Sequence, residues 1–280
     1  MSSCDTCPSK GTCNEQSCSK MLPKYGKIKN IIGIISGKGG VGKSTVTGIL
    51  AAQLSKAGYK VGVLDADITG PSMPRVLGIS DKRAQVMQME GTEEVRFTPV
   101  ETEGGIKVMS LNLLTEQEDQ PVIWRGPLIT GVLNQMYADT MWGELDYLLI
   151  DMPPGTGDIA LTIMQSTPIT GMVVVSTPQN MVSMIVKKVV VMIEKMNVNL
   201  LGVVENMSYI KCGTCGEKLR VFSKKPATEH AEYLGASLLA EMPINLDMIE
   251  SLENGKMESY IKESKEYEQL FEKFMEQLNK

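Results

Sequence analysis

The sequence predicts an α/β fold with a doubly wound, mostly parallel sheet. Short apolar runs alternate with helical patterns along most of the 280 residues, which is the order expected when helices connect parallel strands. A glycine-rich loop joins the first predicted strand to the first helix. Aspartates directly follow the second and fourth predicted strands. Because parallel strands of this fold carry their ligands at the carboxyl ends, these features place the expected site at one edge of the sheet.

Each predicted strand is a short apolar run. Residues 31–35 form a β-branched run before the glycine-rich loop, and residues 60–65 start at a lysine and continue through an apolar run to a terminal aspartate. Runs that are apolar at nearly every position are typical of parallel strands covered on both faces. The same reasoning predicts strands at 106–111, 145–150, 171–176, 199–204 and, more briefly, 237–241.

Helical patterns fill most of the intervals between these strands. Helices are predicted at 45–57, 127–138, 181–196, 247–253 and 257–278. Residues 70–105 are rich in proline, glycine and charge, which favours loops with short elements. Residues 1–25 carry no apolar periodicity. The chain therefore divides into a cysteine-rich tail, 1–25, and one α/β domain, 26–280.

The loop after the first strand has the spacing of a phosphate-binding P-loop. Its glycines let backbone N–H groups turn inward around a phosphate, and the helix that follows adds the positive end of its dipole. We expect Lys43 to reach the β- and γ-phosphates of ATP and Ser44 to ligate Mg²⁺. A chance glycine-rich turn is the alternative, which the flanking strand and helix disfavour. The predicted nucleotide-binding residues here are Gly37, Lys38, Gly39, Gly40, Val41, Gly42, Lys43, Ser44 and Thr45.

Three aspartates after the strands are assigned roles around the nucleotide. Asp151 follows the apolar run 145–150 and is expected to hold a water on Mg²⁺, which makes the domain a P-loop ATPase domain. Asp67 is expected to orient or deprotonate the attacking water, and Asp65 to support the Mg²⁺ shell. For each of them the alternative is a carboxylate that caps a helix N-terminus. Gly155, in a proline- and glycine-rich segment after Asp151, is expected to sense the γ-phosphate.

Composition excludes several classes of partner. Apolar residues make up 42% of the chain and charged residues 22%, which is ordinary for a globular protein. The net charge of −5 argues against nucleic acid, which requires clustered Lys and Arg. No stretch approaches the roughly 18 to 20 apolar residues of a membrane span, and the first residues do not resemble a signal peptide. We therefore expect a cytoplasmic protein.

Four of the six cysteines lie in the N-terminal tail. Small, polar and turn-forming residues separate them, so four thiolates on one loop could wrap a 4Fe–4S cluster or a zinc ion. The irregular spacing, without two matched pairs, favours iron–sulfur. A disordered tail with incidental cysteines is the alternative. These residues are Cys4, Cys7, Cys13 and Cys18.

The other two cysteines, Cys212 and Cys215, form a tight CxxC pair. Two thiolates supply half of a coordination sphere, and the same pair of a second chain could complete it across a two-fold axis. A 4Fe–4S cluster that bridges a homodimer follows from this ligand count. The alternatives are a zinc site completed by an N-terminal cysteine and a dithiol redox pair.

The motifs together resemble a known family over about residues 28–255. Residues 37–45 resemble the deviant Walker A motif of the MinD and nitrogenase-iron-protein class. The segments 64–72, 124–127, 151–158 and 204–208 are similar to the Mrp/ApbC branch of iron–sulfur cluster carriers. The tail resembles that of a eukaryotic scaffold subgroup, with compressed spacing.

The resemblance implies specific roles. Lys38 would cross a homodimer interface to the partner's nucleotide, which adds it to the expected catalytic residues Lys43, Asp67 and Asp151. Asn206 would recognise adenine, with residues 243–245 nearby. The CxxC pair lies where the family bridges a 4Fe–4S cluster.

The expected function is therefore a homodimeric, slowly hydrolysing ATPase that assembles a 4Fe–4S cluster and passes it to apo-proteins. The leading alternative is a MinD/ParA-like regulatory or positioning ATPase with structural zinc. Membrane docking by such proteins uses a basic amphipathic C-terminal helix, whereas residues 257–280 are mixed in charge, which disfavours it.

Overall fold

The chain is described by a computed structural model that covers residues 20–68, 70–88, 91, 94–115 and 126–280. The predicted tail ligands Cys4, Cys7, Cys13 and Cys18 lie outside the described residues. Predictions about them stay predictions.

Within the described residues, nine strands form one sheet in the order β10-β9-β8-β1-β7-β2-β6-β5, and β11 pairs with β9. The pairings are parallel except β10 with β9 and β5 with β6. The predicted fold class is therefore confirmed. The strands are β1 (Tyr25–Ser36), β2 (Val61–Asp65), β5 (Val100–Glu101), β6 (Lys107–Met109), β7 (Met141–Asp151), β8 (Gly171–Ser176), β9 (Leu200–Lys211), β10 (Lys218–Leu219) and β11 (Leu238–Pro243).

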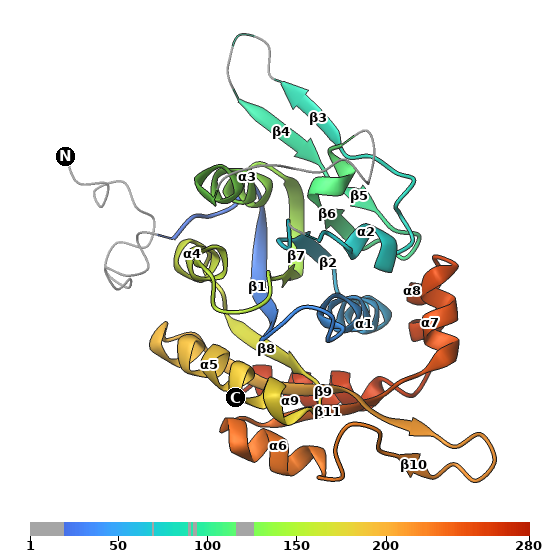
Figure 1. Cartoon of the computed structure of the whole chain (residues 1–280). Helices are drawn as coiled ribbons and strands as arrows, with labels where there is room; N and C mark the ends of the chain where they lie inside the picture. The colour runs from blue at the N-terminus through green and yellow to red at the C-terminus, as the bar shows by residue number, and fades with distance from the viewer. Residues whose placement is uncertain (1–19, 69, 89–90, 92–93, 116–125) are drawn as a thin grey trace.

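Helices cover both faces of this sheet (Figure 1). Side chains of β1 alternate between the two layers, with Ile32 and Ile34 on one face and Ile31 and Ile35 on the other. This period of two follows from strand geometry. The first face packs against α1 (Lys43–Lys56), α2 (Met73–Val76), α7 (Leu246–Glu253), α8 (Met257–Glu263) and α9 (Glu268–Leu278). The second packs against α3 (Gly126–Ala138), α4 (Asp158–Ser166), α5 (Asn180–Lys195) and α6 (Ala227–Leu234).

Two hairpins extend beyond the layers in Figure 1. One consists of β3 (Gln85–Gln88) and β4 (Val95–Thr98), which form a separate antiparallel pair. The other hairpin joins β9 to β10 and carries the CxxC pair. Apart from these hairpins, a short 3₁₀ helix, η1 (Leu111–Leu113), follows β6 in the chain.

Several predicted boundaries were wrong. Strands β1 and β9 extend well beyond the predicted 31–35 and 199–204 because their polar ends still pair with neighbours. Helices α4 and α6 were not predicted. The predicted helix 257–278 is two helices, since Ser264 leaves the helical region with ψ 140°.

The strand order brings the expected site together. The central strand β7 lies between β1 and β2, and Asp151 is in register with Ile34 on one side and Asp65 on the other. The loop that leaves β1 therefore lies beside both aspartates at the carboxyl edge of the sheet.

Candidate functional site

The glycine-rich loop between β1 and α1 has a backbone that requires glycine at two positions. Gly40 and Gly42 are left-handed, with φ of 76° and 83°. A Cβ on Gly42 would lie 2.2 Å from Nδ2 of Asn206. That amide donates to the Val41 carbonyl at 2.9 Å. Asn206, expected at the adenine, thus also fixes the turn of the loop from β9.

Asp151 is fully buried and organises the side chains that follow the loop. Its Oδ2 accepts from Lys43 Nζ at 2.7 Å and from Ser44 Oγ at 2.6 Å, and its Oδ1 accepts from Thr47 Oγ1 at 2.8 Å. Lys43 also lies 3.5 Å from Asp67 Oδ2. Adjacent hydroxyl and carboxylate oxygens are ligands that Mg²⁺ accepts, and a buried ammonium beside them suits a phosphate. These residues fit a magnesium nucleotide.

Asp65 is engaged by protein donors. Its Oδ2 accepts from the Met73 N–H and from Ser110 Oγ, both at 3.1 Å, and its Oδ1 accepts from the Asp67 N–H at 3.3 Å. Burial, and then the charge of Asp151, raises the pKa of Asp65 to about 7. Met73 is the first residue of α2. The geometry therefore matches the helix-capping alternative, and a part in the Mg²⁺ shell stays a prediction.

Two further predicted residues contact neighbouring segments. Lys38 Nζ donates to Gln179 Oε1 at 3.1 Å, so it links the loop to the residue before α5. The Gly155 N–H donates to the Ser36 carbonyl at 2.7 Å, which places the segment after β7 against the start of the loop.

Sequence reasoning missed Thr47 and Gln179. Thr47 lies four residues after Lys43, so both project from the same side of α1; that spacing could have identified it. Gln179 follows the carboxyl end of β8, where this fold places its site residues, but no motif marks it.

Cys212 and Cys215 lie on the turn between β9 and β10. The Cys212 N–H donates to the Glu217 carbonyl and the Gly216 N–H to the Cys212 carbonyl, both at 2.9 Å. Gly216 is left-handed, with φ 73°. Cys212 is half-buried and Cys215 exposed. Hydrogen bonds from the backbone of Cys215, and then of Thr214, lower the pKa of the Cys212 thiol, which favours the thiolate that binds metal.

Within the part of the chain that the structure describes, no group of three or more His, Cys, Asp and Glu side chains could hold a metal ion. The two thiols of the turn are thus half of a tetrahedral set. Further ligands would come from outside the described residues or from another molecule.

Comparison with known proteins adds the family. Residues 27–279 match the family model described as ParA: NUBPL iron-transfer P-loop NTPase. The chain belongs to this family of P-loop NTPases. It is similar to the iron–sulfur cluster carrier protein of Clostridium perfringens, with 64% identity over 97% of this chain and 99% of that protein.

Solved structures of similar proteins agree with the fold of this family member. A nucleotide-binding protein from Archaeoglobus fulgidus, in complex with ADP, is 40% identical with a TM-score of 0.73, covering 87% of this chain and 92% of that chain. The cell division ATPase MinD of Pyrococcus furiosus is 22% identical with a TM-score of 0.57, covering 89% and 98%. This last likeness shows the fold alone. No helix among the described residues is long and apolar enough to cross a bilayer.

Proposed function

We propose that the protein is an ATP-binding and ATP-hydrolysing carrier that assembles a 4Fe–4S cluster and passes it to apo-proteins. The observation that carries the proposal is the cysteine turn. Cys212 and Cys215 share one turn in which hydrogen bonding lowers the pKa of the Cys212 thiol, and within the described residues no third protein ligand joins them. A cluster that takes only two of its ligands from this turn and the others from elsewhere can be taken up and released as cargo. Membership of an iron-transfer family and the name of the C. perfringens relative support it.

A homodimer would complete the cluster site, because a two-fold axis places the same turn of a second chain opposite the first. Reduced thiols at both turns suit the cytoplasm. A second cluster at the four tail cysteines is part of this proposal.

The nucleotide site would act through the contacts described above. ATP with Mg²⁺, when bound, supplies the phosphoryl group whose transfer drives the cycle. Lys43 would give up its contact with Asp151 and bind the phosphates instead. Asp151 and Ser44 would then be available to Mg²⁺. Asp67 would orient the attacking water, and Lys38 would leave Gln179 to reach the partner's nucleotide. Hydrolysis would be slow, because the bound nucleotide would set how long each conformation of the dimer lasts.

Anaerobic metal and sulfide analysis with a visible absorption spectrum tests the proposal. We expect iron, acid-labile sulfide and a broad band near ~400 nm from thiolate-ligated iron, with the bridging share lost in Cys212→Ala/Cys215→Ala. Glu217→Gln is the matched control, since this residue contributes its backbone carbonyl to the turn. Zinc without sulfide at the wild-type turn would instead favour a MinD/ParA-like regulatory ATPase with structural zinc.

A further inference from the structure

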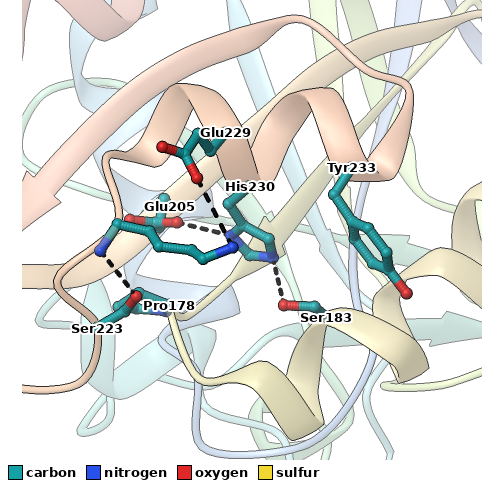
Figure 2. Close-up of a pocket in the computed structure, with 8 residues that line it drawn as sticks. Pro178, Ser183, Glu205, Ser223, Glu229, His230 and Tyr233 are labelled. Carbon is teal, nitrogen blue, oxygen red and sulfur yellow. Dashed lines mark hydrogen bonds and ion pairs between the residues drawn. The ribbon is translucent and has the colours of Figure 1, made fainter.

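A polar network outside the nucleotide site surrounds His230, the single histidine of the chain. A cavity of about 290 Å³ is lined there by Pro178 and Ser183 near the start of α5, by Glu205 of β9 and by His230 of α6. Figure 2 shows His230 between Ser183 and Glu205. Three separate elements, α5, β9 and α6, therefore meet at one imidazole.

Both nitrogens of His230 are engaged. Nε2 lies 2.9 Å from Ser183 Oγ, and Nδ1 lies 2.6 Å from Glu205 Oε2. Because a carboxylate accepts, Nδ1 is the protonated nitrogen in the neutral ring, and Nε2 then accepts from Ser183. Glu205 is only 1% exposed and the His230 side chain 10%. Such a buried contact orients the ring firmly.

The network continues through Ser208. Its Oγ lies 2.7 Å from Glu205 Oε1 and 2.8 Å from Glu241 Oε1. A regular strand would place Glu205 and Ser208 on opposite faces, but Met207 between them is left-handed, with φ 55°. A hydroxyl has one proton, so Ser208 donates to Glu205 or to Glu241 but not to both. This gives the network two discrete arrangements.

Glu241 extends the network to the cysteine turn. It accepts from Lys218 Nζ at 2.9 Å and pairs with the Arg220 guanidinium, which also donates to Ser208 Oγ at 3.2 Å. Lys218 belongs to β10, the strand that returns from the CxxC pair. Since β10 pairs with β9 at just two positions, these side-chain contacts add to the backbone hydrogen bonds of the turn in holding β10 beside β9.

The opposite end of the network reaches the nucleotide loop. The Gln179 carbonyl accepts from the Ser183 N–H at 3.2 Å, and the Gln179 side chain accepts from Lys38 at 3.1 Å. If Lys38 leaves Gln179 for a nucleotide, the residue directly before α5 loses this side-chain contact, and Ser183 lies one helical turn further along.

We propose that the hydrogen-bonded chain Gln179–Ser183–His230–Glu205–Ser208–Glu241–Arg220 couples the nucleotide loop to the cysteine turn, with His230 as its central positioning residue. The proposal rests on the proposed function and names the contacts that link its two sites. A change in the contact of Lys38 would be transmitted to His230 through α5. It would then shift whether Ser208 donates its proton to Glu205 or to Glu241. That choice alters how firmly Glu241 holds Lys218 and Arg220, and hence the exposure of Cys212. Contacts with two arrangements can carry such coupling.

The order serine, histidine, glutamate is also that of serine hydrolases. Here Ser183 Oγ additionally contacts the Gln179 carbonyl at 3.4 Å, and the acid is tied onward through Ser208. Because the contacts continue in both directions, we assign a positioning role.

The test uses cluster-free full-length protein and measures alkylation of Cys212 and Cys215 by iodoacetamide, resolved by peptide mass spectrometry, with and without ATP and Mg²⁺. We expect nucleotide to change the wild-type rate by about fivefold or more, the lower end of measured couplings. His230→Leu should bring the ratio close to one while ATP affinity is unchanged, and His230→Gln should restore part of it. Ser183→Ala is the milder variant if His230→Leu is unstable. Tyr233→Phe, on the same helix and cavity, is the matched control.

The outcomes separate the proposals. A full nucleotide effect in His230→Leu or Ser183→Ala overturns the coupling chain and leaves the carrier function standing. No nucleotide effect in wild type, in protein that still acquires a cluster, overturns the coupling alone. Protein that acquires no cluster on reconstitution fails as a carrier whatever its alkylation rates. Labelling of Ser183 by a fluorophosphonate, lost in His230→Leu, would show an activated nucleophile and overturn the positioning role.

Discussion

At the scale of single residues, the nucleotide site is organised by one buried carboxylate. Asp151 is engaged by Lys43, Ser44 and Thr47, so an ion pair and two hydroxyl donors compensate its burial. A buried charge is tolerated when its lone pairs are satisfied, and removing one partner leaves the others undersupplied. The same side chains that stabilise the fold are therefore those that would rearrange around a phosphate.

A substitution at Thr47 tests whether these contacts stabilise the fold, and it leaves every predicted nucleotide contact in place. Thr47→Val keeps the shape of the side chain but removes a donor from Asp151, so we expect unfolding free energy to fall by about 1–3 kcal/mol. Urea unfolding of nucleotide-free protein measures this. Thr162→Val is the comparison, because this α4 threonine donates to the Asp158 carbonyl in an exposed hydrogen bond and does not contact Asp151; an equal loss there would mean that the Asp151 contact is not the cause.

At the scale of elements, Asp146 ties three strands together. Its side chain pairs with Lys29 of β1 at 2.7 Å and accepts from the Lys60 N–H, just before β2, at 2.9 Å. Hydrogen bonding from Lys29, and then from Lys60, holds the pKa of Asp146 below its ordinary value. A carboxyl whose pKa is lowered on folding stabilises the fold above its unfolded pKa, and this contribution is lost as the pH falls through the folded pKa.

Asp146→Asn should therefore lower the unfolding free energy at pH 7 by about 1 kcal/mol. The gap to wild type should close as the pH falls below about 4, near the pKa of an unfolded aspartate. Denaturant unfolding at pH 7, 5 and 3 checks this. A gap that is constant across these pH values would point to lost packing instead of lost charge.

The cysteine turn offers a second test at this scale. Gly216 is left-handed with open space at its Cβ position, whereas Gly213 has the same open space without a left-handed backbone. Gly216→Ala should strain the turn by about 1 kcal/mol and reduce iron retained after reconstitution, while Gly213→Ala should retain wild-type iron. Iron content per chain and ATP affinity are the measurements. Equal iron in both variants would mean that turn geometry does not set retention.

The elements also show which features the sequence could predict. Apolar runs such as 31–35 and 171–176 became central strands because continuous burial needs no distant information. The clustering of Asp65 and Asp151 followed from the shared edge of parallel strands. Helix α6 and the break at Ser264 carry weak local signals, since tertiary packing decides them. His230 entered no sequence prediction, because its partners Glu205 and Ser183 come from β9 and α5, and no local pattern shows that these elements meet.

At the scale of the whole molecule, the two halves of the proposed activity lie on one sheet. The nucleotide loop leaves β1 and the cysteine turn leaves β9, with β8 between them. Asn206 holds the loop, and Glu205 beside it begins the contacts toward the turn. Strand β9 therefore touches both sites through adjacent residues, which makes it the element best placed to transmit a nucleotide-dependent change.

A cluster held by the cysteine turns of two chains can be told apart from a cluster held within one chain by measuring iron in heterodimers. Wild-type chains with one affinity tag are mixed with Cys212→Ala/Cys215→Ala chains that carry a different tag under dissociating conditions, and the heterodimers are isolated through both tags in succession before anaerobic reconstitution. If the cluster takes two thiolates from each chain, these heterodimers should lack the bridging cluster almost entirely. Wild-type homodimers should bind four irons at this site per two chains, as ligand count requires. If the tail of the same chain completes the site, heterodimers should keep half of the wild-type iron. A tagged Glu217→Gln chain, mixed in the same way, should give full iron, which ties the loss to the thiolates and not to the mixing.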